Sequence, residues 1–139
     1  MTELEDRVAE AYRNALAQRE NPAAPVAAVH KVTLNIGSTD RHGNSLSPDV
    51  RAGCLDYVLR AMGELFGGAS SYAGTGSWVA ENGTLVVEPN DFVYSFTTTP
   101  WARDFALPLA RRIAQQLDQE AVMVSIEPAV SIDFVTQED

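Results

Sequence analysis

Lysine is almost missing from this chain, and with it much of the positive charge that nucleic-acid binding needs. Lys31 is the only lysine, and acidic residues outnumber basic ones by 19 to 10, which gives a formal net charge of -9. Because binding to a phosphate backbone depends on clustered cations, we expect no duplex DNA or RNA partner. The acidic balance is compatible with a basic protein partner or with solubility alone.

Cysteine and histidine are scarce as well. Cys54 is the only cysteine, which excludes an internal disulfide and a cysteine-based zinc site. His30 and His42 are the only histidines, and no metal-binding spacing connects them. We therefore expect no metal and no cofactor. The position of Cys54 on the apolar side of a predicted helix is typical of a small hydrophobic residue.

The chain also lacks an apolar run of the ~18 residues that a membrane span requires. It begins with acidic residues rather than with a basic and apolar leader, so we expect no signal peptide. These patterns predict a cytoplasmic protein without a membrane partner. The 139 residues, 45% of them hydrophobic, fit one domain with a single core.

The clearest positive signal is a β-hairpin in the middle of the chain. Asn82-Gly83 separates two β-rich runs, which is the pattern of a two-residue type I′ turn with positive φ at both central residues. Gly74 and Gly76 in the first run indicate bulges or a close backbone neighbour. Further on, Glu88-Pro89-Asn90-Asp91 favours a type I turn into a third strand over a bulge in one long strand.

Apolar periodicity predicts the elements on either side of this hairpin. Hydroxyl–proline pairs at Ser47-Pro48 and Thr99-Pro100 indicate two helix starts, and Gly67-Gly68 ends the first of these helices. Pro108 leaves two alternatives for the second, a kink or a regular part that begins near Ala106. Helices are expected over 2–20, 47–66 and 99–119, and strands over 29–36, 121–126 and, as an optional last strand, 130–135.

This order predicts an α+β, ferredoxin-like fold: one antiparallel sheet with two helices on one face, plus an N-terminal helical arm. The arm and its Pro/Ala linker span residues 1–28, and the ferredoxin-like domain spans residues 29–136. Two interpretations of the arm remain open, since it can pack on its own domain or dock on a second copy.

The domain contains a series of short motifs in this order: Gly67-Gly68, Gly76-x-Trp78, Asn82-Gly83, Glu88 and Gln119-Glu120-x-Val122. This string resembles a set of small ferredoxin-like α+β proteins of unknown function, some of them from bacteriophage genomes. The resemblance spans about residues 30 to 126 and implies the fold. It brings no catalytic residue that can be matched.

The densest polar cluster follows the first strand and precedes a helix N-terminus. Helix N-termini attract anions, and Arg41 can add a bidentate contact to a phosphate or carboxylate. The other interpretation is a solvated connecting loop, and no acyl-transfer motif surrounds Asp40 and His42. A small anionic or nucleotide-like ligand is expected to contact Ser38, Thr39, Asp40, Arg41, His42 and Asn44.

The main functional prediction is a non-catalytic binding or interaction protein that forms a homo-oligomer. Alternating aromatic residues can give the open sheet face an apolar surface, which usually marks an interface. In a phage or mobile element, such a protein could block or sequester a host component. The alternative is a small-molecule binding protein or enzyme that uses loop 38–44, and a third interpretation is a structural subunit of a larger particle. The expected interface residues are Trp101, Tyr94, Phe96 and Tyr12.

Overall fold

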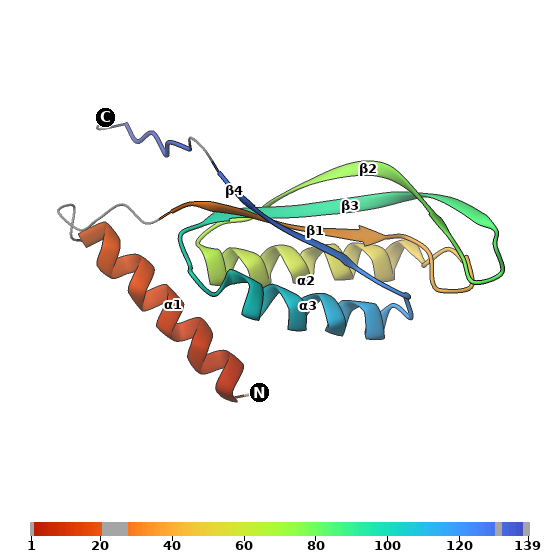
Figure 1. Cartoon of the computed structure of the whole chain (residues 1–139), viewed down its shortest axis with the longest axis horizontal. Helices are drawn as coiled ribbons and strands as arrows, with labels where there is room; N and C mark the ends of the chain where they lie inside the picture. The colour runs from red at the N-terminus through yellow and green to blue at the C-terminus, as the bar shows by residue number, and fades with distance from the viewer. Residues whose placement is uncertain (1, 21–27, 130–131, 138–139) are drawn as a thin grey trace.

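The chain forms an antiparallel sheet with two helices packed beneath it (Figure 1). The computed structural model describes residues 2–20, 28–129 and 132–137. Within these residues the strand order is β2-β3-β1-β4, and all neighbouring strands are antiparallel. This order confirms the predicted ferredoxin-like α+β fold. The elements are α1 (Thr2–Glu20), β1 (His30–Gly37), α2 (Pro48–Phe66), β2 (Ser70–Val79), β3 (Leu85–Thr97), α3 (Ala102–Gln116) and β4 (Met123–Pro128).

Helix α2 starts and ends where its sequence predicts. The Ser47 hydroxyl accepts a hydrogen bond from the Val50 amide at 3.2 Å, and Pro48 occupies the first helical position. Gly67 adopts a left-handed φ of 86° and closes the helix. Both ends of α2 are therefore specified by local sequence.

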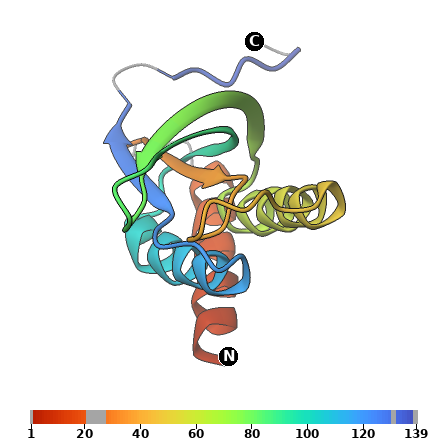
Figure 2. The ribbon, with the colours of Figure 1, turned by 90° about the vertical axis from the view of Figure 1, so that its right-hand side faces the viewer.

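The core lies between the sheet and the helices α2 and α3 (Figure 2). Every second residue of β1 points into this layer, as the strand period requires. The opposite face of the sheet carries no helix among the described elements (Figures 1 and 2); we call it the open face. The largest buried core side chains include Val32, Leu34, Val58, Met62, Val93 and Ile113.

The predicted turn at residues 88–91 is wrong. β3 runs without interruption from Leu85 to Thr97, and β2 pairs with it in continuous register, so no bulge is present either. β1 pairs only with residues 90–97 of this strand. Pro89 therefore lies just beyond that ladder, at the kind of strand position that tolerates proline.

The hairpin exists as predicted, but its turn type is wrong. The connection from β2 to β3 comprises residues 80–84, and only Gly83 within it has a positive φ, of 82°. The Gly83 amide donates to the Ala80 carbonyl at 2.8 Å, and the Ala80 amide donates to the Thr84 carbonyl at 2.9 Å. A longer loop of this kind needs one left-handed glycine rather than two positive φ values.

Helix α3 is shorter than predicted at both ends. Thr99 does not cap it, because its hydroxyl accepts a hydrogen bond from the Thr97 hydroxyl at 2.9 Å instead, and the helix begins at Ala102. Pro108 lies inside the helix, which excludes a regular part that begins only at Ala106. After Gln116 the chain leaves the helix, and Asp118 adopts a positive φ of 52°.

The remaining elements differ from prediction by small shifts. β4 spans Met123–Pro128, so it starts and ends two residues later than the predicted strand over 121–126. Residues 132–135 form no strand, and residues 130–131 of that optional strand lie outside the described part. Helix α1 has its predicted bounds, and its Leu4 and Val8 pack against the core. The N-terminal arm therefore contacts its own domain.

Candidate functional site

A row of aromatic side chains crosses the open face. The rings of Tyr72 and Phe92 are stacked at 4.7 Å between centroids, and Tyr94 lies 5.9 Å from both Tyr72 and Phe96. The Lys31 ammonium lies 4.8 Å from the centroid of the Tyr94 ring. Tyr72 is 48% exposed, so the stacked end of the row is accessible from solvent. Rings arranged in this way offer a flat apolar surface to a planar ligand.

Two glycines of β2 let the neighbouring side chains of β3 lie flat across the sheet. A Cβ at Gly74 would lie 2.6 Å from the Phe92 ring, and one at Gly76 would lie 2.5 Å from Asn90 Nδ2. The close neighbours of these glycines are side chains of β3, so the predicted backbone neighbour is wrong, and the continuous register also excludes the predicted bulges. Asn90 is only 4% exposed as a result.

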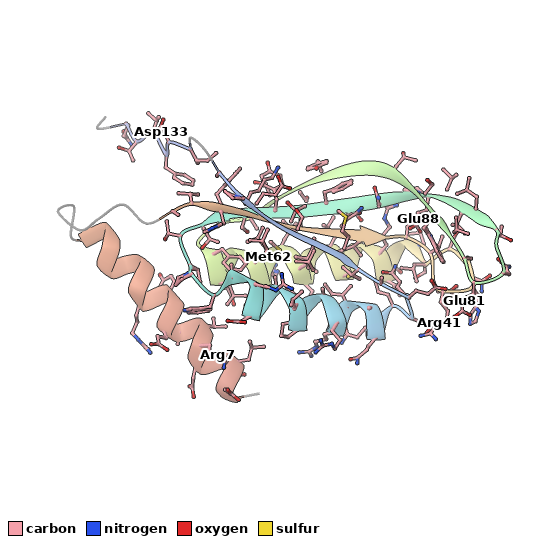
Figure 3. The ribbon with its side chains drawn as sticks, in the orientation of Figure 1. Arg7, Arg41, Met62, Glu81, Glu88 and Asp133 are labelled. Carbon is pink, nitrogen blue, oxygen red and sulfur yellow. The ribbon has the colours of Figure 1, made fainter. Side chains whose placement is uncertain are left out.

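Beside Asn90, a carboxylate is held at the end of the sheet where β1 stops (Figure 3). Glu88 Oε2 accepts hydrogen bonds from the Ser38 amide, at 3.1 Å, and from the Thr39 hydroxyl. The Ser38 hydroxyl donates to the Pro89 carbonyl at 2.6 Å. The loop after β1 therefore takes the place of that strand beside Glu88 and Pro89 of β3. Glu88 itself is 7% exposed.

The same loop is held from the other side by Gln119. Its Nε2 donates to the carbonyl oxygens of Gly37 and Thr39, at 2.9 and 3.0 Å. Gln119 reaches this position because α3 ends at Gln116 and the chain turns through Asp118. The backbone that carries Ser38 and Thr39 is thus fixed from both α3 and β3.

Oxygen acceptors without protein partners gather around Gly37. Within the described residues, Asn35 Oδ1, Asn90 Oδ1 and Gln119 Oε1 are buried and accept no hydrogen bond. Asn90 is the register partner of Gly37, and a Cβ at Gly37 would collide with Glu88 Oε1. Buried acceptors are normally satisfied, so such a group marks a place where a donor can bind. We call Asn35, Glu88, Asn90 and Gln119 the acceptor cluster.

The charge of this cluster is not balanced by the protein. No lysine, arginine or histidine within the described residues lies within ion-pair distance of Glu88. The neighbouring Asp91 points to the helix side and pairs with Arg51 of α2 at 3.1 Å. Lys31 lies at the opposite end of β1. The acceptor cluster therefore favours a ligand group that is cationic or rich in N–H donors.

The six loop residues predicted to bind a ligand do not converge on one point. Ser38 and Thr39 are buried and bound to β3, as described above. Arg41 pairs with Asp118, which follows α3, at 2.7 Å. Asp40 accepts hydrogen bonds from the backbone amides of His42 and Asn44, and the bond from Asn44 is the main cause that lowers the pKa of Asp40.

The four predicted interface residues come from different parts of the fold. Tyr94 and Phe96 belong to the aromatic row of the open face. Trp101 precedes α3 and is partly buried, and Tyr12 of α1 is 51% exposed.

Other candidate groups have structural roles. Cys54 is half-buried, and burial, followed by the nearby Asp91 charge, raises the pKa of its thiol. In residues 2–20, 28–129 and 132–137 no cluster of His, Cys, Asp and Glu could hold a metal ion. None of the helices in those ranges has the length and apolarity needed to cross a membrane.

Comparison with known proteins identifies similar folds. No family model and no curated protein sequence matches this chain. A phage SAM lyase in complex with S-methyl-5′-thioadenosine is similar, with a TM-score of 0.57 and 18% identity over 76% of this chain and 84% of that one. The same kind of enzyme in its apo state gives a TM-score of 0.50 at 18% identity, over 71% and 79% of the two chains. A Bacillus cereus protein related to NIF3 gives 0.51 at 17% identity, over 78% of this chain but 28% of that one.

These similarities correct the main functional prediction. The fold is similar to that of a phage SAM lyase whose structure holds S-methyl-5′-thioadenosine, whereas the sequence favoured a non-catalytic protein that blocks a host component. The small-molecule alternative agrees better with this finding. The resemblance to phage proteins is supported at the level of fold.

Sequence reasoning missed the residues that define the acceptor cluster. Glu88 and Asn90 were assigned to a turn, Asn35 to a strand, and Gln119 to the end of a helix. One signal was present: in a single continuous strand, the alternation of β3 puts Glu88 and Asn90 on the same face as Phe92. The missing partners come from segments about fifty to eighty residues away, such as Thr39 for Glu88 and Gly37 for Gln119.

Proposed function

We propose that this protein binds an adenosine-containing sulfonium or thioether on the open face of its sheet. The observation that carries the proposal is the acceptor cluster, with an uncompensated carboxylate, immediately beside the aromatic row. The similarity in fold to a phage SAM lyase, with S-methyl-5′-thioadenosine bound, supplies the ligand class. The proposed ligand is S-adenosylmethionine or a close relative.

The aromatic row suits the purine ring of such a ligand. Base stacking on an aromatic side chain contributes about 1–3 kcal/mol per base. Tyr72 and Phe92 form a stacked pair of rings, and Asn90 is the next residue of β3 on the same face of the sheet. A purine on these rings would therefore place the rest of the ligand near the acceptor cluster.

The charges of the site favour a sulfonium over a phosphorylated nucleotide. A phosphate would meet Glu88 and the amide oxygens of Asn35 and Asn90, and the protein carries an overall charge of -9. A sulfonium or ammonium group would be attracted by the same oxygens. This inference replaces the anionic ligand expected from the sequence with a cationic one.

An enzymatic role follows as a second candidate. Cleavage of a carbon–sulfur bond of a sulfonium leaves the electron pair on sulfur, which becomes a neutral thioether, and the carboxylate of the ligand's own amino-acid part can form the new bond to the released carbon. A carboxylate that contacts the ligand can position the sulfonium or the amino group for this step. Glu88 is fixed by two hydrogen bonds to Oε2, and its Oε1 has no donor within the described residues, which suits such a role.

The test is isothermal titration calorimetry of the wild-type protein and Glu88→Gln with S-adenosylmethionine and S-methyl-5′-thioadenosine. A unit-charge pair at about 4 Å is worth about 4 kcal/mol at an effective dielectric constant of about 20, before desolvation is subtracted. We expect a net loss of about 1.5–3 kcal/mol in Glu88→Gln, which is a Kd about 10- to 100-fold higher for the sulfonium. Binding of the uncharged thioether should change much less.

Two matched variants control the experiment. Glu127→Gln removes an exposed carboxylate whose register partner is Lys31, near the far end of β1. Arg41→Ala/His42→Ala alters the outward-facing part of the loop. Both should bind like the wild type. Equal loss in Glu127→Gln, or no binding of either compound by the wild type, contradicts the proposal, and mass spectrometry of the mixtures reports whether the sulfonium is cleaved.

We keep three expectations from the sequence as proposals: the domain division at residue 28, the homo-oligomer and the cytoplasmic location. A phage or mobile-element source is suggested by the fold similarity to a phage enzyme.

A further inference from the structure

One edge of the sheet lacks the usual protection against pairing with another strand. β2 is the edge strand next to β3 (Figure 1), and residues 65–80 carry no charged side chain. β2 contains no proline and pairs with β3 without a bulge. Natural edge strands are usually blunted by charges, prolines or bulges, because their outer backbone groups are unpaired. The outer edge of β2 is thus open to strand addition.

The opposite edge of the same sheet is protected. β4 has 6 residues and ends in Glu127-Pro128, and Glu127 is exposed. A short strand that ends in a charge and a proline resists pairing. The difference between the two edges shows that protection is missing specifically at β2.

We propose that the outer edge of β2 binds β2 of a second copy of this chain, antiparallel and across a two-fold axis. Two copies with a net charge of -9 repel each other over most of their surfaces. The uncharged edge lets the backbones approach without placing like charges opposite each other. An antiparallel edge is also self-complementary, as a two-fold interface requires.

We propose the register in which Thr75 lies opposite Thr75 of the partner subunit. The open faces of the two sheets then lie on the same side of the dimer. The side-chain period of a strand then places Tyr72 opposite Trp78 of the partner subunit, and Gly74 opposite Gly76 of the partner subunit. Tyr72 and Trp78 lie on the open face, because Tyr72 stacks on Phe92 and the alternation of β2 brings Trp78 to the same side. The partner's indole would extend the aromatic row across the two-fold axis. This pairing does not depend on the proposed ligand.

The first test measures molecular mass by native mass spectrometry and light scattering. The wild-type protein is expected at twice its chain mass of 15.1 kDa. Thr75→Lys places two ammonium groups at the two-fold axis and should reduce the mass to that of one chain, with unchanged circular dichroism. Gln116→Lys adds the same charge on the exposed side of α3 and should remain a dimer.

The second test is disulfide cross-linking, which detects the proposed strand pairing without disrupting it. Directly opposite residues of antiparallel strands have Cα atoms about 4.5–5.5 Å apart, within disulfide range. C54A/T75C should form a covalent dimer under mild oxidation, and C54A/Q116C should not. A wild-type protein that stays monomeric at micromolar concentration overturns the proposal. The proposal is also overturned if the wild-type protein assembles but C54A/T75C does not form the covalent dimer. This result is decisive even if Thr75→Lys does not fold.

Discussion

Because Gly37 has no side chain, the Glu88 carboxylate can lie against it. A single added methyl group at Gly37 should therefore displace this carboxylate, which is at the centre of the proposed site. Gly37 has no positive φ, so alanine fits its backbone conformation. A Cβ at this position collides with Glu88 Oε1. Gly37→Ala must therefore move the carboxylate away from the Ser38 amide and the Thr39 hydroxyl.

The expected cost follows from those two hydrogen bonds. Hydrogen bonds to a charged group contribute about 1.5–3 kcal/mol each, and part of this is regained when the carboxylate reaches water. We expect Gly37→Ala to lower the free energy of unfolding by about 2–4 kcal/mol, measured by urea denaturation. Gly53→Ala is the matched control, because its Cβ would meet no atom within 4 Å. It lies inside α2 and should stabilise the protein by about 0.5–1 kcal/mol.

A double-mutant cycle isolates the cause. In the background of Glu88→Ala the added methyl group has no carboxylate to displace, so Gly37→Ala should cost less than about 0.5 kcal/mol there. If Gly37→Ala is equally destabilising with and without Glu88, the reasoning about this contact is wrong.

Two further outcomes test the surroundings of the site. Gln119→Met removes both hydrogen bonds to the loop carbonyls and should cost about 1–3 kcal/mol of stability by urea denaturation, whereas the exposed Gln116→Met should be nearly neutral. Cys54 should react with iodoacetamide far more slowly in the folded protein than in urea, because its raised pKa keeps the thiol protonated. Since the thiol ionises more readily in the unfolded chain, stability relative to C54A should fall as the pH rises from about 8 to about 10. Fast alkylation of the folded protein, or a pH slope equal to that of C54A, contradicts this assignment.

Local signals were sufficient for the architecture. The cap at Ser47 and the left-handed Gly67 fix α2 without help from distant residues, and the order of elements then predicts the sheet. The sequence also indicated a close neighbour at Gly74 and Gly76, although it predicted backbone where the structure has side chains. These are consequences of backbone conformation and side-chain period, which short segments carry by themselves.

The candidate site could not be predicted because its residues are defined by distant partners. Glu88-Pro89-Asn90-Asp91 has the composition of a turn, and pairing with β1, β2 and the loop after β1 keeps it extended. Thr99 has the composition of a helix cap, but Thr97 offers its hydroxyl a nearer partner. In both cases tertiary contacts override local preference.

The most direct test of the proposed site is a nuclear magnetic resonance titration of the labelled protein with S-adenosylmethionine. The account predicts that the amide signals of Gly37, Ser38 and Asn90 shift most, together with those of Tyr72 and Phe92. Signals of the exposed turn at residues 41–43 should shift little. Shifts confined to that turn, or no saturable shifts at all, would contradict a sulfonium site on the open face beside Glu88.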